Sequence, residues 1–252
     1  FRVSAFVNIG ANWRMLRSDY SRTDRLGELY DLWLYRPAAF GSADAKRPVC
    51  MRDLKIRPFG AQADFHPRRD NGSRSAKVPI LLINATSLNS GRNWRFEASR
   101  MGESPSALIR SATTDLRPRY AQPISYDVLP EHLAHIPLGK AVAASTAVPG
   151  LFRPLPISAL YPKRILQLVD GAVHDNQGVQ GLLDERCDLL LVSDASAQLS
   201  EDPKPDPNFL PVLLRTEAIL LHRVREEQMN LCASTPLAFI HMRQGLTPPT
   251  IT

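Results

Sequence analysis

The stretch that decides the predicted fold is residues 164–196, which read RILQLVDGAVHDNQGVQGLLDERCDLLLVSDAS. Apolar side chains dominate residues 165–169 and residues 189–192, and two such runs are typical of buried strands. The segment between them, with a leucine pair at 182–183, has room only for a short crossover helix. A strand, a turn, a helix and a second strand in this order predict a parallel sheet, and therefore an α/β fold.

Asp170 is the strongest single candidate for chemistry in this stretch. In a parallel sheet the functional groups gather just past the carboxyl ends of the strands, and Asp170 is at that position. Gly171 follows it and lets the chain turn sharply. An ordinary Asp-Gly turn is the alternative interpretation, because composition alone gives about one such dipeptide in a chain of this length.

The composition is that of an ordinary globular protein, with 252 residues, 44% hydrophobic and 22% charged. That length is sufficient for one large core. The net charge of +6 favours mild attraction to anionic surfaces, including phospholipid headgroups. No stripe of arginine and aromatic residues predicts nucleic-acid binding. No apolar run approaches the roughly 18 to 20 residues of a membrane span.

The cysteines and histidines predict no metal site. The three cysteines are widely and irregularly spaced, which favours a reducing compartment over a disulfide framework. Asp64 and His66 stand two residues apart, and His132 and His135 stand three apart. Both pairs are expected to be solvated loop residues rather than ligands.

The first residues predict an upstream extension. The chain begins with Phe1, and the residues that follow lack the layout of a cleavable signal peptide. We therefore expect a fragment whose natural start lies upstream. The expected location is cytoplasmic, or peripheral to the inner face of a membrane.

Local patterns predict the first part of the chain as helical and then irregular. Two helices are expected in residues 1–36, the second capped by Ser21 or Thr23. Residues 37–77 are rich in proline, glycine and arginine, and predict a long surface excursion with at most one short strand, at 51–56.

The remaining segments predict alternating strands and helices. In the helix expected at residues 141–147, small side chains predict that this helix approaches its neighbours closely. The expected elements are a strand at 78–85, a turn at 89–91, a partner strand at 93–97, a helix at 141–147, a connector at 197–207, a long helix at 209–231 and a strand at 237–242.

Four blocks of the sequence resemble successive blocks of the patatin-like phospholipase family. They are VPILLINATSLNSGRNWRFEASRMGE (78–103), PLGKAVAASTAVPGLFRPL (137–155), LVDGAVHDNQGVQGLL (168–183) and VLLRTEAILLHRVREEQ (212–228). The resemblance covers about residues 10–245, and residues 37–77 match only loosely.

This resemblance implies a three-layer α/β/α fold with a mainly parallel central sheet, incomplete at its N-terminus. Residues 1–252 would be the C-terminal part of a single hydrolase domain. The implied activity is lipid acyl hydrolysis, a carboxylic ester hydrolase reaction, by a Ser–Asp dyad that requires no metal or organic cofactor. The implied partner is a lipid or another acyl ester, with peripheral membrane contact and no nucleic acid.

By the same resemblance, Asp170 is the aspartate of the dyad, and Gly171 and Ala172 complete its D-G-A motif. Ala172 departs from the commoner second glycine of the family. Asn176 stands where the family usually has an asparagine. His174 is expected to support the site or the start of a helix, and a Ser–His–Asp triad or a metal pair with Asp175 is the alternative.

The serine half of such a site is missing from the sequence. The only Gly-x-Ser is Gly102-Glu103-Ser104, and Pro105 after it has no backbone N–H to donate to an oxyanion. Ser145 lacks flanking glycines and is expected to be a packing residue. The nucleophile and the oxyanion loop are therefore expected upstream, and residues 1–252 alone are expected to be inactive. The alternative function is that of a non-catalytic relative that binds lipid or a partner protein.

Overall fold

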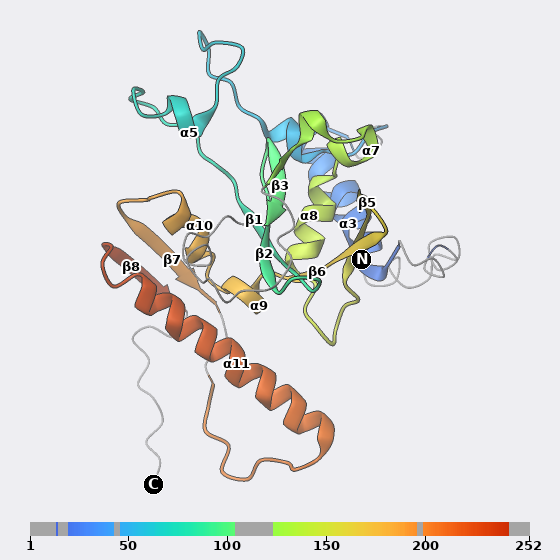
Figure 1. Ribbon diagram of the computed structural model, residues 1–252, viewed down its shortest axis with the longest axis vertical. Helices are drawn as coiled ribbons and strands as arrows, with labels where there is room; N and C mark the ends of the chain where they lie inside the picture. The colour runs from blue at the N-terminus through green and yellow to red at the C-terminus, as the bar shows by residue number, and fades with distance from the viewer. Residues whose placement is uncertain (1–13, 15–19, 43–45, 104–122, 196–198, 242–252) are drawn as a thin grey trace. The chain divides into compact units, whose positions relative to one another are not determined.

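The computed structural model describes residue 14 and residues 20–42, 46–103, 123–195 and 199–241 (Figure 1). The chain divides into two compact units, Phe1–Gly171 and Ala172–Thr252, here called unit 1 and unit 2. Each unit is described by itself.

Unit 1 contains a six-stranded sheet and several helices. Its helical elements are α3 (Arg22–Tyr30), η1 (Asp31–Tyr35), α4 (Arg36–Phe40), η2 (Met51–Leu54), α5 (Pro67–Asp70), η3 (Tyr126–Val128), α7 (Glu131–Ala134) and α8 (Leu138–Ser145). Its strands are β1 (Ile83–Ser87), β2 (Arg92–Phe96), β3 (Arg100–Glu103), β4 (Ile124–Ser125), β5 (Leu155–Tyr161) and β6 (Arg164–Asp170).

The sheet of unit 1 is curled and antiparallel throughout, in the order β4-β3-β2-β1-β6-β5. The predicted three-layer α/β/α fold with a mainly parallel central sheet is therefore wrong. The reason lies in a connection of two residues, Pro162 and Lys163, between β5 and β6. A link this short can join only antiparallel strands, because a parallel pair needs a crossover of a dozen or more residues.

The second strand of the expected parallel unit, β7 (Leu190–Asp194), lies in unit 2 and pairs in parallel with β8 (Leu237–His241). The expected order of strand, turn, helix and strand is present, with α9 (Ala172–Asp175) and α10 (Val179–Asp184) between β6 and β7. The prediction that β6 and β7 share a sheet is wrong.

Other local predictions are confirmed. Ser21 caps α3 by accepting hydrogen bonds from the backbone N–H groups of Thr23 and Asp24. β1 and β2 form the expected hairpin, although β1 begins later than predicted, after Pro79, which has no N–H to donate. The first of the two helices expected in residues 1–36 falls almost wholly outside the described residues.

The strand predicted at residues 51–56 is instead the 3₁₀ helix η2 followed by irregular chain. The carboxylate of Asp53 accepts a hydrogen bond from the N–H of Cys50 at 2.9 Å, which closes a turn in place of an extended chain. Cys50 and Met51 are buried, so the predicted surface excursion also contributes to the core of unit 1.

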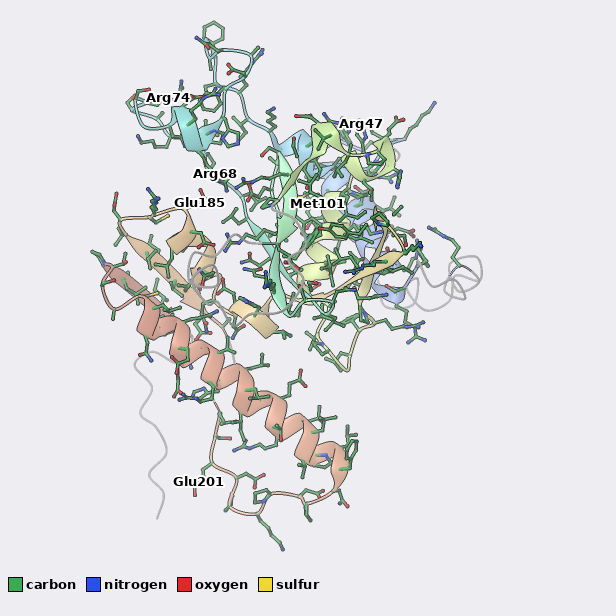
Figure 2. All side chains as sticks on the ribbon, in the orientation of Figure 1. Arg47, Arg68, Arg74, Met101, Glu185 and Glu201 are labelled. Carbon is green, nitrogen blue, oxygen red and sulfur yellow. The ribbon has the colours of Figure 1, made fainter. Side chains whose placement is uncertain are left out.

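The core of unit 1 lies between the sheet and α8. Trp94 is fully buried there, together with the alanines of α8. Met101, labelled in Figure 2, is fully buried in the same core. Gly27 of α3 and Gly139 of α8 lie in direct contact, where a Cβ atom on either glycine would clash with the other helix's backbone. The helix α8 therefore does approach a neighbour closely, as the sequence predicts, although the contact is made at Gly139 and not by the small residues at 141–147.

Unit 2 has a smaller core and more exposed apolar surface. Val179 and Leu190 are fully buried between α10 and the β7–β8 pair. The long helix α11 (Phe209–Leu231) has the predicted bounds, and its residues Phe209, Leu213 and Leu220 are exposed. Within the described ranges, no helix combines the length and the apolar character needed to cross a membrane.

Candidate functional site

Asp170 is the last residue of β6, next to β1 in the middle of the sheet, and its side chain is half-buried. It stands directly opposite Ala85 of β1. Residues opposite each other in an antiparallel pair share a face of the sheet. Ala85 is fully buried in the core that includes Ala141 and Ala144 of α8. Asp170 therefore lies at the edge of the face that α8 covers.

The backbone of Asp170 is held from two sides. Its N–H donates a hydrogen bond to the carbonyl oxygen of Ala147, just after α8, at 3.0 Å. The hydroxyl of Thr86 in β1 donates a hydrogen bond to the carbonyl oxygen of Asp170 at 2.9 Å. The neighbouring strand and the end of α8 thus fix the position from which this carboxylate projects.

Gly171 is needed for space. A Cβ atom at this position would lie 2.7 Å from the carbonyl oxygen of Asn84, which is backbone and cannot rotate away. The sequence indicated a glycine that permits a sharp turn. The structure shows a glycine that permits close packing of the chain against β1.

The other predicted site residues belong to unit 2, which begins at Ala172. His174 is in α9, and its carbonyl oxygen accepts a hydrogen bond from the side-chain amide of Gln228 at 3.0 Å. Asn176 follows α9 and is half-buried. The structure therefore places Asp170 and Gly171 in one unit, and Ala172, His174 and Asn176 in the other.

Asp175 caps a helix. It is buried, and its two carboxylate oxygens accept hydrogen bonds from the backbone N–H groups of Val179 and Gln180, at 3.0 and 2.9 Å. This role argues against the alternative in which Asp175 completes a triad or a metal pair with His174. Among the described residues, no three His, Cys, Asp or Glu side chains are grouped so that they could hold a metal ion.

Two serines were considered as nucleophiles, Ser104 and Ser145. Ser104 lies outside the described residues. Ser145 is the last residue of α8 and is half-buried.

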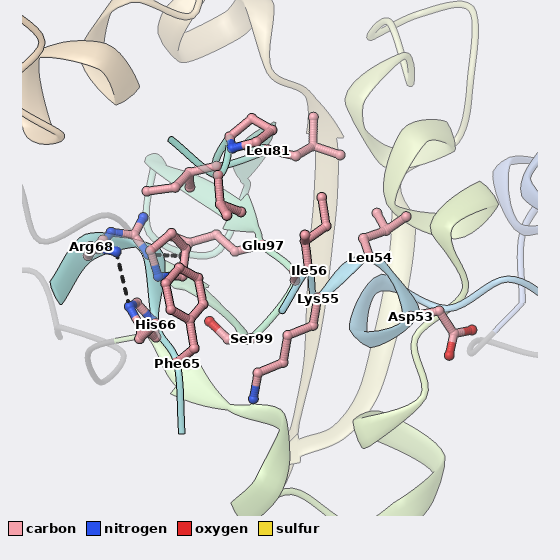
Figure 3. Close-up of a pocket in the computed structure, with 15 residues that line it drawn as sticks. Asp53, Leu54, Lys55, Ile56, Phe65, His66, Arg68, Leu81, Glu97 and Ser99 are labelled. Carbon is pink, nitrogen blue, oxygen red and sulfur yellow. Dashed lines mark hydrogen bonds and ion pairs between the residues drawn. The ribbon is translucent and has the colours of Figure 1, made fainter. Parts of the chain in front are cut away.

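Unit 1 also contains a half-open pocket of about 560 Å³, here called the loop pocket (Figure 3). Four segments line it, at residues 53–56, 65–68, 78–81 and 97–99. The first two belong to the stretch that the sequence predicted as a surface excursion. The sequence signal for this pocket was the set of large apolar residues in that stretch, Leu54, Ile56 and Phe65 among them. Several such residues in one loop indicate that part of it packs against the protein or forms an apolar surface.

His66 lines the loop pocket and caps α5. Its Nδ1 accepts a hydrogen bond from the N–H of Arg68 at 3.3 Å, so that the ring proton is on Nε2. Burial lowers the pKa of the imidazole, and the nearby Arg68 and Arg100 guanidinium groups lower it further. Asp64, two residues earlier, forms an exposed ion pair with Arg69 at 3.0 Å.

Comparisons of the chain with protein-family models, with curated proteins and with solved structures found no match.

Proposed function

We propose that Asp170 is the general base of a Ser–Asp dyad in a lipid acyl hydrolase, a carboxylic ester hydrolase like the patatin-like phospholipases that the sequence resembles. One observation carries the proposal. A half-buried aspartate ends β6, an interior strand of the sheet between β1 and β5, and its backbone is held by both Thr86 and Ala147. The antiparallel sheet removes the expected fold as an argument, so the proposal rests on this local geometry and on the D-G-A motif.

The reaction needs a base at such a position. A serine hydroxyl is a weak nucleophile until a placed group accepts its proton. In the proposed step, Asp170 takes the proton as the serine oxygen bonds to the ester carbonyl carbon. Asp170 then gives that proton to the alcohol oxygen as the ester C–O bond breaks, which leaves an acyl-enzyme. Water attacks the acyl carbon as Asp170 takes its proton, and Asp170 returns that proton to the serine oxygen as the acid leaves. A carboxylate is a weaker base than imidazole, so the step also relies on partial burial and on strong oxyanion stabilisation.

The serine of the dyad is proposed to lie outside these 252 residues, because the sequence contains no G-x-S-x-G. It follows that residues 1–252 alone will not hydrolyse p-nitrophenyl esters above background. The same chain will not react with a fluorophosphonate that labels active serines. Stoichiometric labelling of any serine in this chain, Ser145 included, would contradict this part of the proposal.

A binding role is the second candidate. The exposed apolar residues of α11, among them Phe209, Leu213 and Leu220, favour contact with a lipid or a protein over a solvated helix. A protein of this kind would keep its binding after loss of Asp170 and would show no hydrolysis in any form.

The test of the hydrolase is made on the natural full-length protein, as cells produce it. We expect Asp170→Asn to lower the rate of ester hydrolysis by about a hundred- to ten-thousandfold, because a general base is lost while side-chain size is kept. His174→Ala is the comparison variant: a dyad predicts a modest loss, and a triad a loss as large as that of Asp170→Asn. A full-length protein with no hydrolase activity would favour the binding role.

A further inference from the structure

The loop pocket has mainly aliphatic walls. Phe65 and Val78 are buried, whereas Ile56 and Leu81 line the same pocket and are 53% and 50% exposed. Large aliphatic side chains at the surface are common singly, but here they gather around one concave space. The volume of about 560 Å³ is within the roughly 300 to 1,000 Å³ typical of small-molecule sites.

The two carboxylates that line the loop pocket, those of Asp53 and Glu97, each form ion pairs with arginine. Glu97 is nearly buried and pairs with Arg68 at 2.7 Å and with Arg100 at 3.0 Å. Asp53 pairs with Arg47 at 2.6 Å, and Figure 3 shows its side chain turned away from His66 and Arg68. Neither carboxylate would therefore strongly repel an anion in the pocket.

The remaining polar groups of the pocket are donors. Lys55 is exposed and forms no ion pair within the described part of the chain. Burial lowers the pKa of His66, which favours the neutral imidazole, and Nε2 is the ring nitrogen left to donate. Ser99 adds a hydroxyl. A lysine ammonium and two neutral donors beside an apolar space are complementary to one anionic group on an apolar body.

From this arrangement we infer that the loop pocket binds a single-chain amphiphile, an aliphatic chain that ends in a carboxylate or a phosphate. The chain would lie against Ile56 and Leu81, and the head group would contact Lys55 and His66. The site is separate from the proposed hydrolase chemistry, since all its residues are outside the D-G-A motif and its binding needs no serine.

The test is titration calorimetry of the whole chain with decanoate and decyl phosphate. Decan-1-ol, decylammonium and inorganic phosphate serve as ligand controls. We expect decanoate or decyl phosphate, or both, to bind with one molecule per chain. The one with the higher affinity identifies the head group that the pocket prefers. The alcohol is expected to bind about tenfold more weakly, because the ion contact is lost. Phosphate alone and decylammonium are expected not to bind.

Leu81→Asp and Leu88→Asp form a matched pair of variants. Leu88 is 55% exposed and is not part of the pocket, so both substitutions place the same charge at equally exposed leucines. We expect Leu81→Asp to weaken decanoate binding at least tenfold and Leu88→Asp to leave it unchanged. Lys55→Met should weaken decanoate about tenfold without changing the binding of decan-1-ol.

Three results would overturn the inference. They are no binding of either anion to the wild-type chain, equal losses in the two leucine variants, and binding of decan-1-ol as tight as that of decanoate. Asp170→Asn should bind decanoate normally, so that failure of the hydrolase proposal and failure of this one can be told apart.

Discussion

Asp170 and Asp194 both end a β-strand, one in each unit, and their surroundings differ. Asp194, at the end of β7, has a side chain only 2% exposed, and the Nε of Arg225 lies 2.7 Å from its carboxylate. Asp170, at the end of β6, is half-buried and is held through its backbone by Thr86 of β1 and by Ala147, two residues after α8. The same residue type at the same kind of position is thus built into the core in one unit and kept near the surface in the other.

The units around these two aspartates differ as well. Unit 1 closes a core between six strands and α8, with Trp94 fully buried. Unit 2 has two parallel strands, a small core and exposed apolar residues such as Leu191 and Leu220. A two-stranded sheet is marginal by itself, so the stability of this protein should reside mainly in unit 1.

The largest expected effect tests this difference in core packing. Trp94→Ala removes a fully buried indole from unit 1 and should lower the free energy of unfolding by about 3 to 5 kcal/mol. Leu220→Ala, in the exposed face of α11, should change it by at most about 0.5 kcal/mol. Urea denaturation measures both. Similar losses in the two variants would show that the units do not differ in this way.

A smaller effect is expected at the ion pair of unit 2. Asp194→Asn leaves the guanidinium of Arg225 without its charged partner in a site where that side chain is only 14% exposed. Removing one partner of a buried pair typically costs about 3 kcal/mol or more, and salt screens such a pair little. The loss should therefore persist at high ionic strength. If added salt abolished it, the pair would be behaving as a surface contact.

The smallest effect is the pH dependence that His66 contributes to unit 1. The pKa of His66 is lowered by burial and by Arg68 and Arg100, whereas the unfolded chain has a pKa near 6.5. Between the two values the unfolded state binds more protons, so this contribution to stability is present above about pH 6.5 and is lost as the pH falls. We expect His66→Gln to reduce the loss of stability between about pH 7 and pH 5 in denaturation experiments. An unchanged slope would show that other groups govern that range.

The sequence predicted the local elements well. Ser21 caps a helix, residues 209–231 form one, and Asp170 ends a strand, because caps and hydrophobic periodicity act over a few residues. The partners of the strands could not be predicted in the same way. β5 was missed because Pro156 and Ser158 interrupt its apolar run, and without β5 the two-residue link to β6 could not be recognised.

The candidate site was predictable in part. Asp170 and Gly171 were identified from the motif, and their place at the end of a strand is confirmed, although the packing that requires Gly171 depends on Asn84, distant in the sequence. The loop pocket was not predicted, because it forms only when four separate segments within residues 53–99, two of them in the expected surface excursion, fold against one another. Contacts between irregular segments leave no periodic signal in the sequence.

The central claim is that Asp170 serves chemistry whereas Asp194 serves structure. The most direct measurement is kcat/KM for a p-nitrophenyl ester, together with the thermal midpoint, in Asp170→Asn and Asp194→Asn variants of the natural full-length protein. We predict that Asp170→Asn loses about a hundred- to ten-thousandfold in kcat/KM with its midpoint nearly unchanged. Asp194→Asn should lower the midpoint and keep its activity per folded molecule. Near-normal turnover in a well-folded Asp170→Asn protein would contradict the claim.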